Sequence, residues 1–362
     1  MKLTLDTATF SAAIDRAAKV APTKGPHKDL AAGILLQPAG AYLLVKATDT
    51  EVTIIEKVHM PRTPELEEDE ELHSWRLPAG LLAPFVASLD PQGKIEIADV
   101  ENNRVQIAHE STKITLSKLD PDTFPEIPTY PPDDMQVIPD LARKIRSVVW
   151  ARHRDVAPFS GVHFNGNRVT ACDKESLGEI EADVDFGDGM TVPMSAVASA
   201  LGDGDIKLKT EGDRLVLMPY EDVQITTTIF AAAYPPLDHL RTQTFSGITK
   251  IEIDPQALSE RLQRMMVLTN DREFPLARLV VEQKQIIITM SVPETGDMED
   301  VCPHYSDYDA EPFECHVNPL TLSQALRGCR GTIEFGFKEV LKPLTLEDKN
   351  GYSAFIMPRR AA

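Results

Sequence analysis

Two pairs of titratable side chains in this sequence could take part in chemistry. In the segment WARHRD, His153 is followed by Asp155. Such a pair could act as a catalytic base and its orienting acid, although a histidine here more often ends a helix. Asp49 in KATDTE and Asp173 in ACDKES stand at matching positions of two similar segments. They could bind a metal ion, but aspartates that form turns are the simpler interpretation.

A zinc site is a further possibility, with Cys302, His304, Cys315 and His316 as its candidate ligands. The chain has four cysteines but lacks the C-x-x-C spacing that is typical of structural zinc sites. Thiols that pack or lie exposed beside a loop are the alternative, and we expect no metal. The sequence contains no P-loop, GxGxxG, GxSxG or HExxH motif. We therefore expect a protein that is not an enzyme and has no cofactor.

The composition indicates a folded protein of the cytoplasm. Of the 362 residues, 42% are apolar and 26% are charged, which is ordinary for a globular chain. No apolar run reaches the roughly 18 residues needed to cross a bilayer, and the N-terminal MKLTLDTATF lacks the apolar centre of a signal peptide. The net charge of −19 argues against nucleic-acid binding only if the charges are evenly spread.

One unit of sequence occurs three times. In each copy a strand meets Pro78, Pro193 or Pro319 at the start of a short helix, and a turn and three strands follow. The prolines recur at intervals of about 120 residues, as in an internal repeat. A second triplet, of strand, polar break and amphipathic helix, lies at 2–21, 135–151 and 251–268. We expect an α+β fold in which each unit packs two helices on antiparallel sheets.

Segments with the composition of linkers separate these units. They are the proline-rich stretch 120–134 and the stretch 241–250. We therefore predict three domains, at residues 1–127, 128–246 and 247–362.

Positive charge gathers on the predicted helices although the chain is acidic. These helices are expected at 7–21, 79–89, 139–151, 194–202, 255–268 and 319–330, and they hold nine basic and three acidic residues. In the third helix, Leu141, Ile145 and Val148 share one face, and Arg143 and Arg146 point away from it. Such surfaces would attract a phosphate backbone without reading bases, because the sequence has no recognition-helix or zinc-finger motif.

Five stretches of the chain resemble the beta sliding clamp of bacterial DNA polymerase III. They are SKLDPDTFPEI (117–127), RHRDVAPFSGVHF (152–164), VTACDKESLGEI (169–180), AAAYPPLDHL (231–240) and AFIMPRR (354–360). The resemblance extends from end to end and implies three clamp-fold domains per protomer and a six-domain ring as a head-to-tail homodimer. It implies a replication processivity factor that encircles double-stranded DNA and tethers polymerase, clamp loader and repair proteins through short linear peptides.

The resemblance also implies a DNA channel and a joint between protomers. The channel candidates are Arg16, Lys19, Lys24, Lys28, Arg143, Lys144, Arg146, Arg152, Arg154, Arg261, Arg264, Arg327 and Arg330. The joint would connect the first domain of one protomer to the third domain of the other by pairing of edge strands. The matching positions there are Arg104, Ile114, Leu116, Val267, Leu268 and Glu294.

A peptide-binding cleft between the second and third domains is implied as well. The matching positions are Phe159, Cys172, Lys174, Glu175, Ser176, Leu177, Pro235, His239, Leu240, Phe355, Met357, Pro358, Arg359 and Arg360. The chain departs from the family pattern at 174–176, and it has Arg359 where relatives often have methionine. Because these departures change the charge of the cleft, the alternative is a clamp-fold accessory or decoy protein of a mobile element with altered partner specificity.

Overall fold

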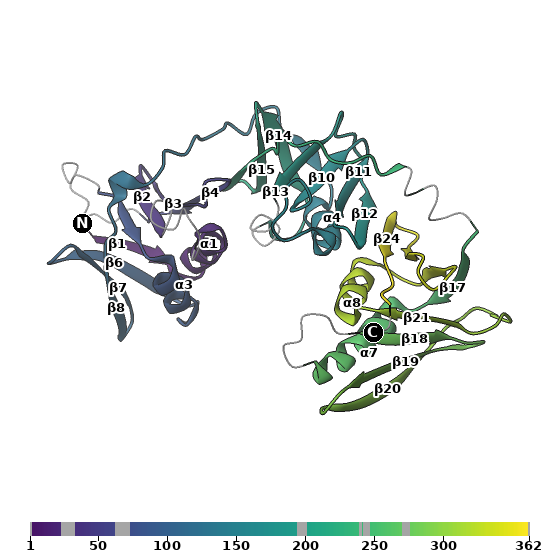
Figure 1. The fold of residues 1–362 in the computed structure, drawn as a ribbon. Helices are drawn as coiled ribbons and strands as arrows, with labels where there is room; N and C mark the ends of the chain where they lie inside the picture. The colour runs from purple at the N-terminus through teal and green to yellow at the C-terminus, as the bar shows by residue number, and fades with distance from the viewer. Residues whose placement is uncertain are drawn as a thin grey trace. The chain divides into compact units, whose positions relative to one another are not determined.

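The computed structural model describes residues 2–22, 33–61, 73–193, 201–238, 241, 247–269 and 276–360. Four of the residues named above, Lys24, Lys28, His239 and Leu240, lie outside these ranges, as does most of the helix expected at 194–202. The chain forms two compact units (Figure 1). The first contains Met1–Ala142 and Ser195–Ile229, and the second contains Arg143–Met194 and Phe230–Ala362.

The first unit is built from two antiparallel sheets and two described helices. The sheets have the strand orders β1-β6-β7-β8 and β5-β2-β3-β4-β16-β15-β14-β9. Helix α1 (Thr7–Val20) packs against α3 (Ala79–Ala87) and against β2, β3 and β4. The remaining elements are β1 (Lys2–Asp6), β2 (Ile34–Ala39), β3 (Tyr42–Thr48), β4 (Val52–His59), β5 (Trp75–Leu77), β6 (Lys94–Val100), β7 (Arg104–His109), β8 (Thr112–Ser117), η1 (Pro121–Thr123), β9 (Gln136–Ile138), β14 (Ile206–Glu211), β15 (Arg214–Tyr220) and β16 (Val223–Thr228).

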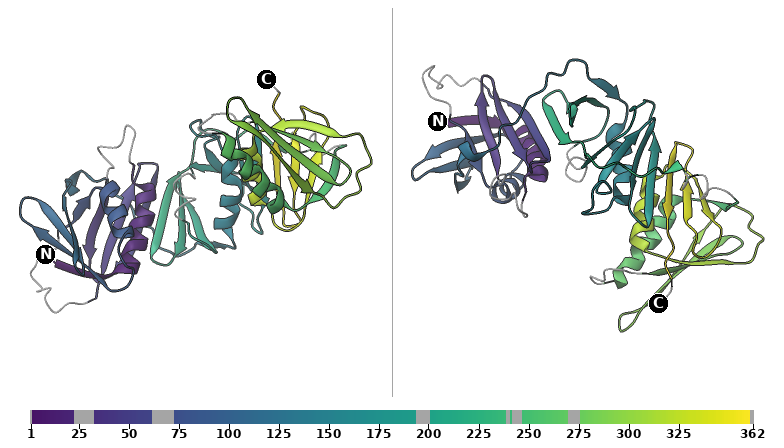
Figure 2. Two further views of the ribbon diagram at one scale, coloured as in Figure 1. Left: turned by 90° about the horizontal axis from the view of Figure 1, so that it is seen from below. Right: turned by 45° about the horizontal axis from the view of Figure 1, so that its top comes forward.

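The second unit repeats this plan, with sheets in the orders β13-β10-β11-β12-β24-β23-β22-β17 and β20-β19-β18-β21. Helices α7 (Pro255–Met265) and α8 (Pro319–Gly328) pack side by side (Figure 2). Most of α4 (Leu141–Val148) belongs here too. The remaining elements are η2 (Val149–Ala151), β10 (Gly161–Asn165), β11 (Arg168–Cys172), β12 (Ser176–Glu181), β13 (Met190–Pro193), β17 (Thr249–Ile253), η3 (Met266–Leu268), β18 (Ala277–Val281), β19 (Gln285–Val292), β20 (Gly296–Pro303), β21 (Phe313–Val317), β22 (Ile333–Phe337), β23 (Leu344–Glu347) and β24 (Tyr352–Ile356).

Three helices begin in the same way, directly after a strand. Asp6, Asp254 and Asn318 precede α1, α7 and α8, and each side chain accepts a hydrogen bond from an amide of the first turn, at 2.8, 3.0 and 2.9 Å. Such caps provide partners for amides that the start of a helix leaves without one. Each helix then buries one apolar face, as the predicted periodicity requires; in α1 this face includes Phe10 and Ile14.

The α+β prediction is therefore confirmed, and the described helices lie within the predicted ranges. The three repeated prolines, however, differ in their roles. Pro319 occupies the first turn of α8 as expected, whereas Pro78 is the residue before α3 and Pro193 ends β13. Among the helices in the described ranges, none is long and apolar enough to cross a membrane.

Each eight-stranded sheet is joined across its middle by strands that are far apart in the sequence. In the first unit β16 pairs with β4, so that Ile225 lies opposite Ile54. In the second unit β24 pairs with β12, so that Phe355 lies opposite Leu177. These pairings remove strand edges that would otherwise be open to other chains. The second pairing brings the end of the chain beside residues 173–176.

Candidate functional site

An apolar cluster marks the place where β24 joins β12. Its buried members are Cys172, Leu177, Leu237 and Phe355, and Phe159 and Tyr234 pack against it. The sequence had indicated four of these six positions. It had missed Tyr234 and Leu237, which belong to the segment that also contains the half-buried Pro235. Met357 is 38% exposed beyond the cluster, and Pro358 is buried.

The turn between β11 and β12 forms one edge of this cluster. The carboxylate of Asp173 accepts hydrogen bonds from the amides of Glu175 and Ser176, both at 2.7 Å, and from the Ser176 hydroxyl at 2.9 Å. Asp49 accepts from two amides of the turn that precedes β4. The turn-forming interpretation of both aspartates is therefore the one that the structure supports.

Two uncharged contacts, one of them to Cys172 in the cluster, hold Tyr234 in place. Its hydroxyl donates to the Cys172 sulfur at 3.1 Å, and its ring stacks on His163 with centroids 4.3 Å apart. Burial raises the pKa of Tyr234 and of Cys172, and it lowers the pKa of His163. All three groups are consequently neutral near pH 7, and the cluster stays apolar in character.

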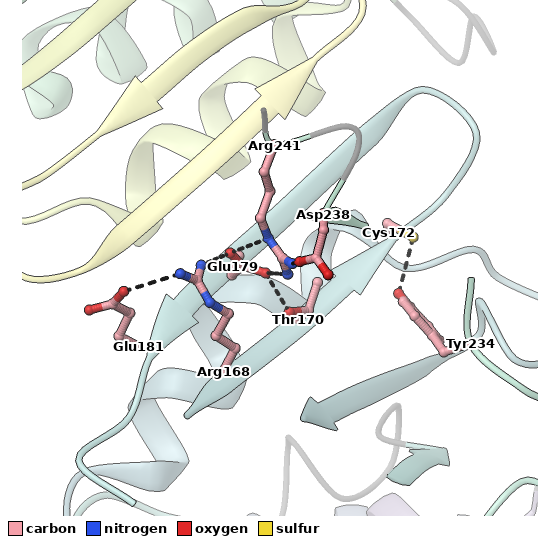
Figure 3. A network of polar contacts seen from close by, with 8 residues as sticks. All are labelled: Arg168, Thr170, Cys172, Glu179, Glu181, Tyr234, Asp238 and Arg241. Carbon is pink, nitrogen blue, oxygen red and sulfur yellow. Dashed lines mark hydrogen bonds and ion pairs between the residues drawn. The ribbon is translucent and has the colours of Figure 1, made fainter. Parts of the chain in front are cut away.

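A buried carboxylate fixes the neighbouring segment (Figure 3). Glu179 on β12 has a side chain only 2% exposed, and it forms ion pairs with Arg168 on β11 and with Arg241. The Nε atom of Arg241 donates to Glu179 at 3.0 Å, and the hydroxyl of Thr170 donates to the same carboxylate at 2.9 Å. Because a buried charge is stable only when it is paired, Arg241 holds the segment that contains Leu237 against β12.

Four arginines line a hollow where α4 and η2 meet the end of α8. They are Arg143, Arg146, Arg327 and Arg330, and the hollow has a volume of about 420 Å³. Among the described residues, no carboxylate contributes to its lining. Helical phase had placed the first pair on the outer face of its helix, and the structure brings it together with the second pair.

An aromatic pair beside the hollow fixes this arrangement. The indole Nε1 of Trp150 donates to the Tyr352 hydroxyl at 3.1 Å, and that hydroxyl donates to the Ala325 carbonyl at 2.9 Å. A Cβ added at Gly328 would lie 2.6 Å from the Tyr352 ring, so only glycine allows this contact. Strand β24, η2 and α8 are thus held together by one side chain.

Several other channel candidates are engaged within the protein. Arg16 donates through Nε to Glu56 at 2.8 Å, and the guanidinium lies 5.5 Å from the ring centroid of Tyr220. The Glu56 hydrogen bond is the main reason why the pKa of Arg16 is raised. Lys19 pairs with Asp15 one turn away, at 2.8 Å.

The basic residues of α7 are paired as well. Arg264 pairs with Asp300 on β20 at 2.6 Å, and Arg261 lies 3.5 Å from the same carboxylate. Arg261 also donates to the Val301 carbonyl at 2.8 Å. Both guanidinium groups are thus engaged by partners within the protein.

Lys144 does not fit the expectation of an open cationic face. It is only 7% exposed, because it follows Leu141 by three positions and precedes Val148 by four, on the buried side of α4. Arg152 is half-buried. Its pKa is lowered mainly by burial, and also by the positive charge of the neighbouring Arg154. Arg154 is exposed.

The candidates for a joint between protomers lie at strand edges and turns. Within the described chain, β8 is the last strand of its sheet; it holds the half-buried Ile114 and the buried Leu116. Val267 in η3 is 73% exposed, and Leu268 is half-buried. Arg104 is exposed at the start of β7, and Glu294 is exposed in the turn before β20.

The remaining chemical candidates have structural roles. The Nδ1 atom of His153 accepts from the amides of Asp155 and Val156, at 3.1 and 3.2 Å, so it caps a turn. Cys302 and Cys315 lie on β20 and β21, at opposite edges of one sheet. Burial raises the pKa of these thiols to about 11 and about 12. Among the described residues, no group of histidine, cysteine and acidic side chains could hold a metal ion.

The Glu179 network generates a testable expectation. We expect Glu179→Gln to lower the free energy of unfolding by about 2 kcal/mol, because both arginines lose their buried counter-charge. The segment around Leu237 should loosen, so that iodoacetamide modifies Cys172 at least fivefold faster, as measured by peptide mass spectrometry. Glu181→Gln is the matched control, since Glu181 is half exposed and contacts Arg168 only at 3.4 Å. Equal alkylation rates in the two variants would contradict this role of Glu179.

Comparison with known proteins agrees with this geometry. Residues 1–128 match the family model of the DNA polymerase III beta subunit, N-terminal domain. Along 100% of both chains, the structure is similar to the DNA polymerase III beta subunit of Thermotoga maritima (TM-score 0.78, 20% identity). Equal coverage is found for a ligand-bound sliding clamp of Pseudomonas aeruginosa (0.75, 20%) and for a Bartonella birtlesii sliding clamp bound to griselimycin (0.77, 20%). The chain thus has the sliding-clamp fold throughout, and its N-terminal region matches the DNA polymerase III beta family.

Proposed function

We propose that this protein is a DNA sliding clamp, in which two copies join head to tail and encircle duplex DNA. In this proposal each copy contributes three domains, at residues 1–127, 128–246 and 247–362, and the ring tethers a replicative polymerase without chemistry of its own. The observation that carries the proposal is the arginine hollow between α4 and α8. It lies in a chain that has the clamp fold and a net charge of −19.

The charge distribution supports a binding site for a phosphate backbone. A chain with this net charge repels DNA from most of its surface, so that contact requires a local concentration of cations. The arginine hollow supplies four guanidinium groups, two from α4, one from α8 and one from the segment after α8, and the Trp150–Tyr352 contact holds η2 and α8 together. Arginine suits phosphate because its planar donors match the phosphate oxygens. Contacts of this kind hold DNA regardless of its sequence.

The arginines of α7 and those at the end of α8 are expected to contribute unequally to the proposed DNA surface. Arg264 already pairs with Asp300 at 2.6 Å, and its charge is therefore largely compensated. Arg327 and Arg330 are exposed at the end of α8. We infer that Arg327 and Arg330 carry more of the affinity for DNA than Arg264.

The open edge of β8 and the exposed Val267 support a joint between protomers. An edge strand can extend the sheet of a second copy, and an exposed apolar side chain of that second copy would be buried in the same contact. The apolar cluster at Phe355 supports the second part of the proposal, a cleft that receives short peptides of the polymerase, the clamp loader and repair proteins. In this proposal, its aromatic and aliphatic members form the apolar surface on which such peptides anchor.

The central experiment measures topological retention. Labelled protein is placed on nicked circular DNA with a clamp loader, and part of the sample is then linearised with a restriction enzyme. We expect a dissociation half-life at least tenfold longer on circles than on the linear product, because a ring can leave only through a DNA end. Equal half-lives would exclude encirclement and would favour the accessory or decoy alternative.

The arginine hollow predicts unequal effects of two double substitutions. Arg327→Ala with Arg330→Ala should weaken binding to a short duplex at least tenfold at low salt, and it should reduce the slope of log affinity against log salt by about 2. Arg264→Ala with Asp300→Ala removes a neutral pair and should change affinity less than threefold. Fluorescence anisotropy measures both. Similar losses in the two variants would contradict the assignment of the hollow.

The joint predicts a change in oligomeric state. We expect light scattering to show a dimer for the wild-type protein and a monomer for Val267→Asp, because a carboxylate would be buried without a partner in the apolar contact. Val340→Asp is the matched control, since Val340 is also exposed, at 54%, but lies outside the proposed joint. A wild-type monomer at micromolar concentration, or an unchanged Val267→Asp dimer, would refute the joint.

A further inference from the structure

Two residues that depart from the family pattern meet in the structure. Glu175, in the turn before β12, forms an ion pair with Arg359, near the end of the chain. Backbone contacts hold both sides: the Met357 amide donates to the Glu175 carbonyl at 2.8 Å, and the Arg359 amide donates to the His316 carbonyl at 2.7 Å. The ion pair therefore has a defined position at the edge of the apolar cluster.

A second hollow, of about 520 Å³, begins at this ion pair. Its lining consists of Glu314, His316, Val340, Leu341, Arg359 and Arg360. Val340 and Leu341 are 54% and 43% exposed, which makes them an open apolar contact. We call this hollow the C-terminal hollow, to distinguish it from the arginine hollow.

Residues 355–360 connect the apolar cluster with the C-terminal hollow. The chain runs from Phe355 in the cluster, past the exposed Met357, to Arg359 and Arg360 at the rim of the hollow. Five extended residues span roughly 16 Å, so one peptide of that length can contact both places. A partner that anchors an apolar side chain in the cluster can thus extend into the hollow.

The charges at the rim indicate what kind of peptide fits. The carboxylate of Glu314 already accepts two hydrogen bonds from Arg278, both at 2.7 Å. Glu175 is paired with Arg359. Arg360 adds an exposed guanidinium, and Lys174 is exposed in the same turn as Glu175. The rim thus has an excess of positive charge next to an apolar floor.

We propose that the C-terminal hollow selects partner peptides in which an apolar residue is flanked by acidic residues. The apolar side chain would pack on Val340 and Leu341, and a carboxylate would bind Arg359 and Arg360. The exposed Glu175–Arg359 pair contributes little stability by itself, so a peptide carboxylate can join it or replace Glu175. This inference rests on the proposed peptide cleft and specifies the chemistry of its partners.

The net charge of the chain, acting at long range, predicts the opposite preference, for basic peptides. A chain with a net charge of −19 attracts basic peptides and repels acidic ones from a distance. At physiological ionic strength, however, this field is screened beyond about 8 Å, and contacts at the rim decide. A preference for acidic peptides can therefore come only from local cations.

The experiment compares three fluorescein-labelled peptides with the full-length protein. All share a central Leu-Phe anchor, and they carry Asp-Leu-Asp, Ser-Leu-Ser or Lys-Leu-Lys on each side of it. We expect the aspartate peptide to bind at least fivefold more tightly than the lysine peptide in 150 mM salt. Arg359→Met and Arg360→Ala should each reduce this ratio below twofold, while Lys94→Ala, which removes an exposed charge in the first unit, should leave it unchanged.

Glu175→Gln distinguishes selectivity from a merely structural ion pair. It breaks the same pair as Arg359→Met but leaves the arginine charged, so we expect the preference for the aspartate peptide to increase. Opposite shifts in these two variants support the proposal, whereas shifts in the same direction would overturn it. Equal binding of all three peptides to the wild-type protein would overturn this inference alone. Failure of all three to bind would overturn the peptide cleft and the inference together.

Discussion

The pairing of β24 with β12 is the constraint on which the second unit depends. Five residue pairs, from Ser176 opposite Ile356 to Ile180 opposite Tyr352, align the two strands. Successive side chains of a strand point to opposite faces of the sheet. Phe355 therefore faces the apolar cluster, and Tyr352 faces α8 and Trp150. A slip of one residue would exchange these faces and dismantle the cluster and the arginine hollow together.

Ion pairs within the protein engage several of the basic side chains on the helices. Glu56 is a nearly buried carboxylate, and it requires a cation from the first unit; Arg16 supplies that cation. Asp300 similarly engages Arg264 at the surface of α7. The basic excess on the helices thus includes several side chains that form ion pairs within the protein. A net count of helical charges overstates the positive surface for this reason.

The helices, their caps and the turn aspartates were predictable because each depends on residues within a few positions of one another. Apolar spacing defines the buried face of α1, and Asp6 directly precedes it. The Glu179 network was not predictable. Its position in SLGEIE alternates with small and apolar residues, which indicates an exposed carboxylate. Burial depends on Arg241, 62 positions further along the chain, and local patterns contain no information on such a partner. The burial of Lys144 was missed for a related reason, since three neighbouring basic residues suggest a solvated face.

The ion pair between Glu175 and Arg359 links two departures that the sequence presents separately, because 184 positions lie between them. Either residue alone would place a charge beside the apolar cluster without this ion-pair partner. Together they compensate each other at the surface, and the buried cluster of Cys172, Leu177 and Phe355 remains intact. The charge at the edge of the apolar cluster can thus change while the cluster itself is retained. Two coupled surface positions are sufficient for such a change, because neither contributes to the core or to the pairing of β24 with β12.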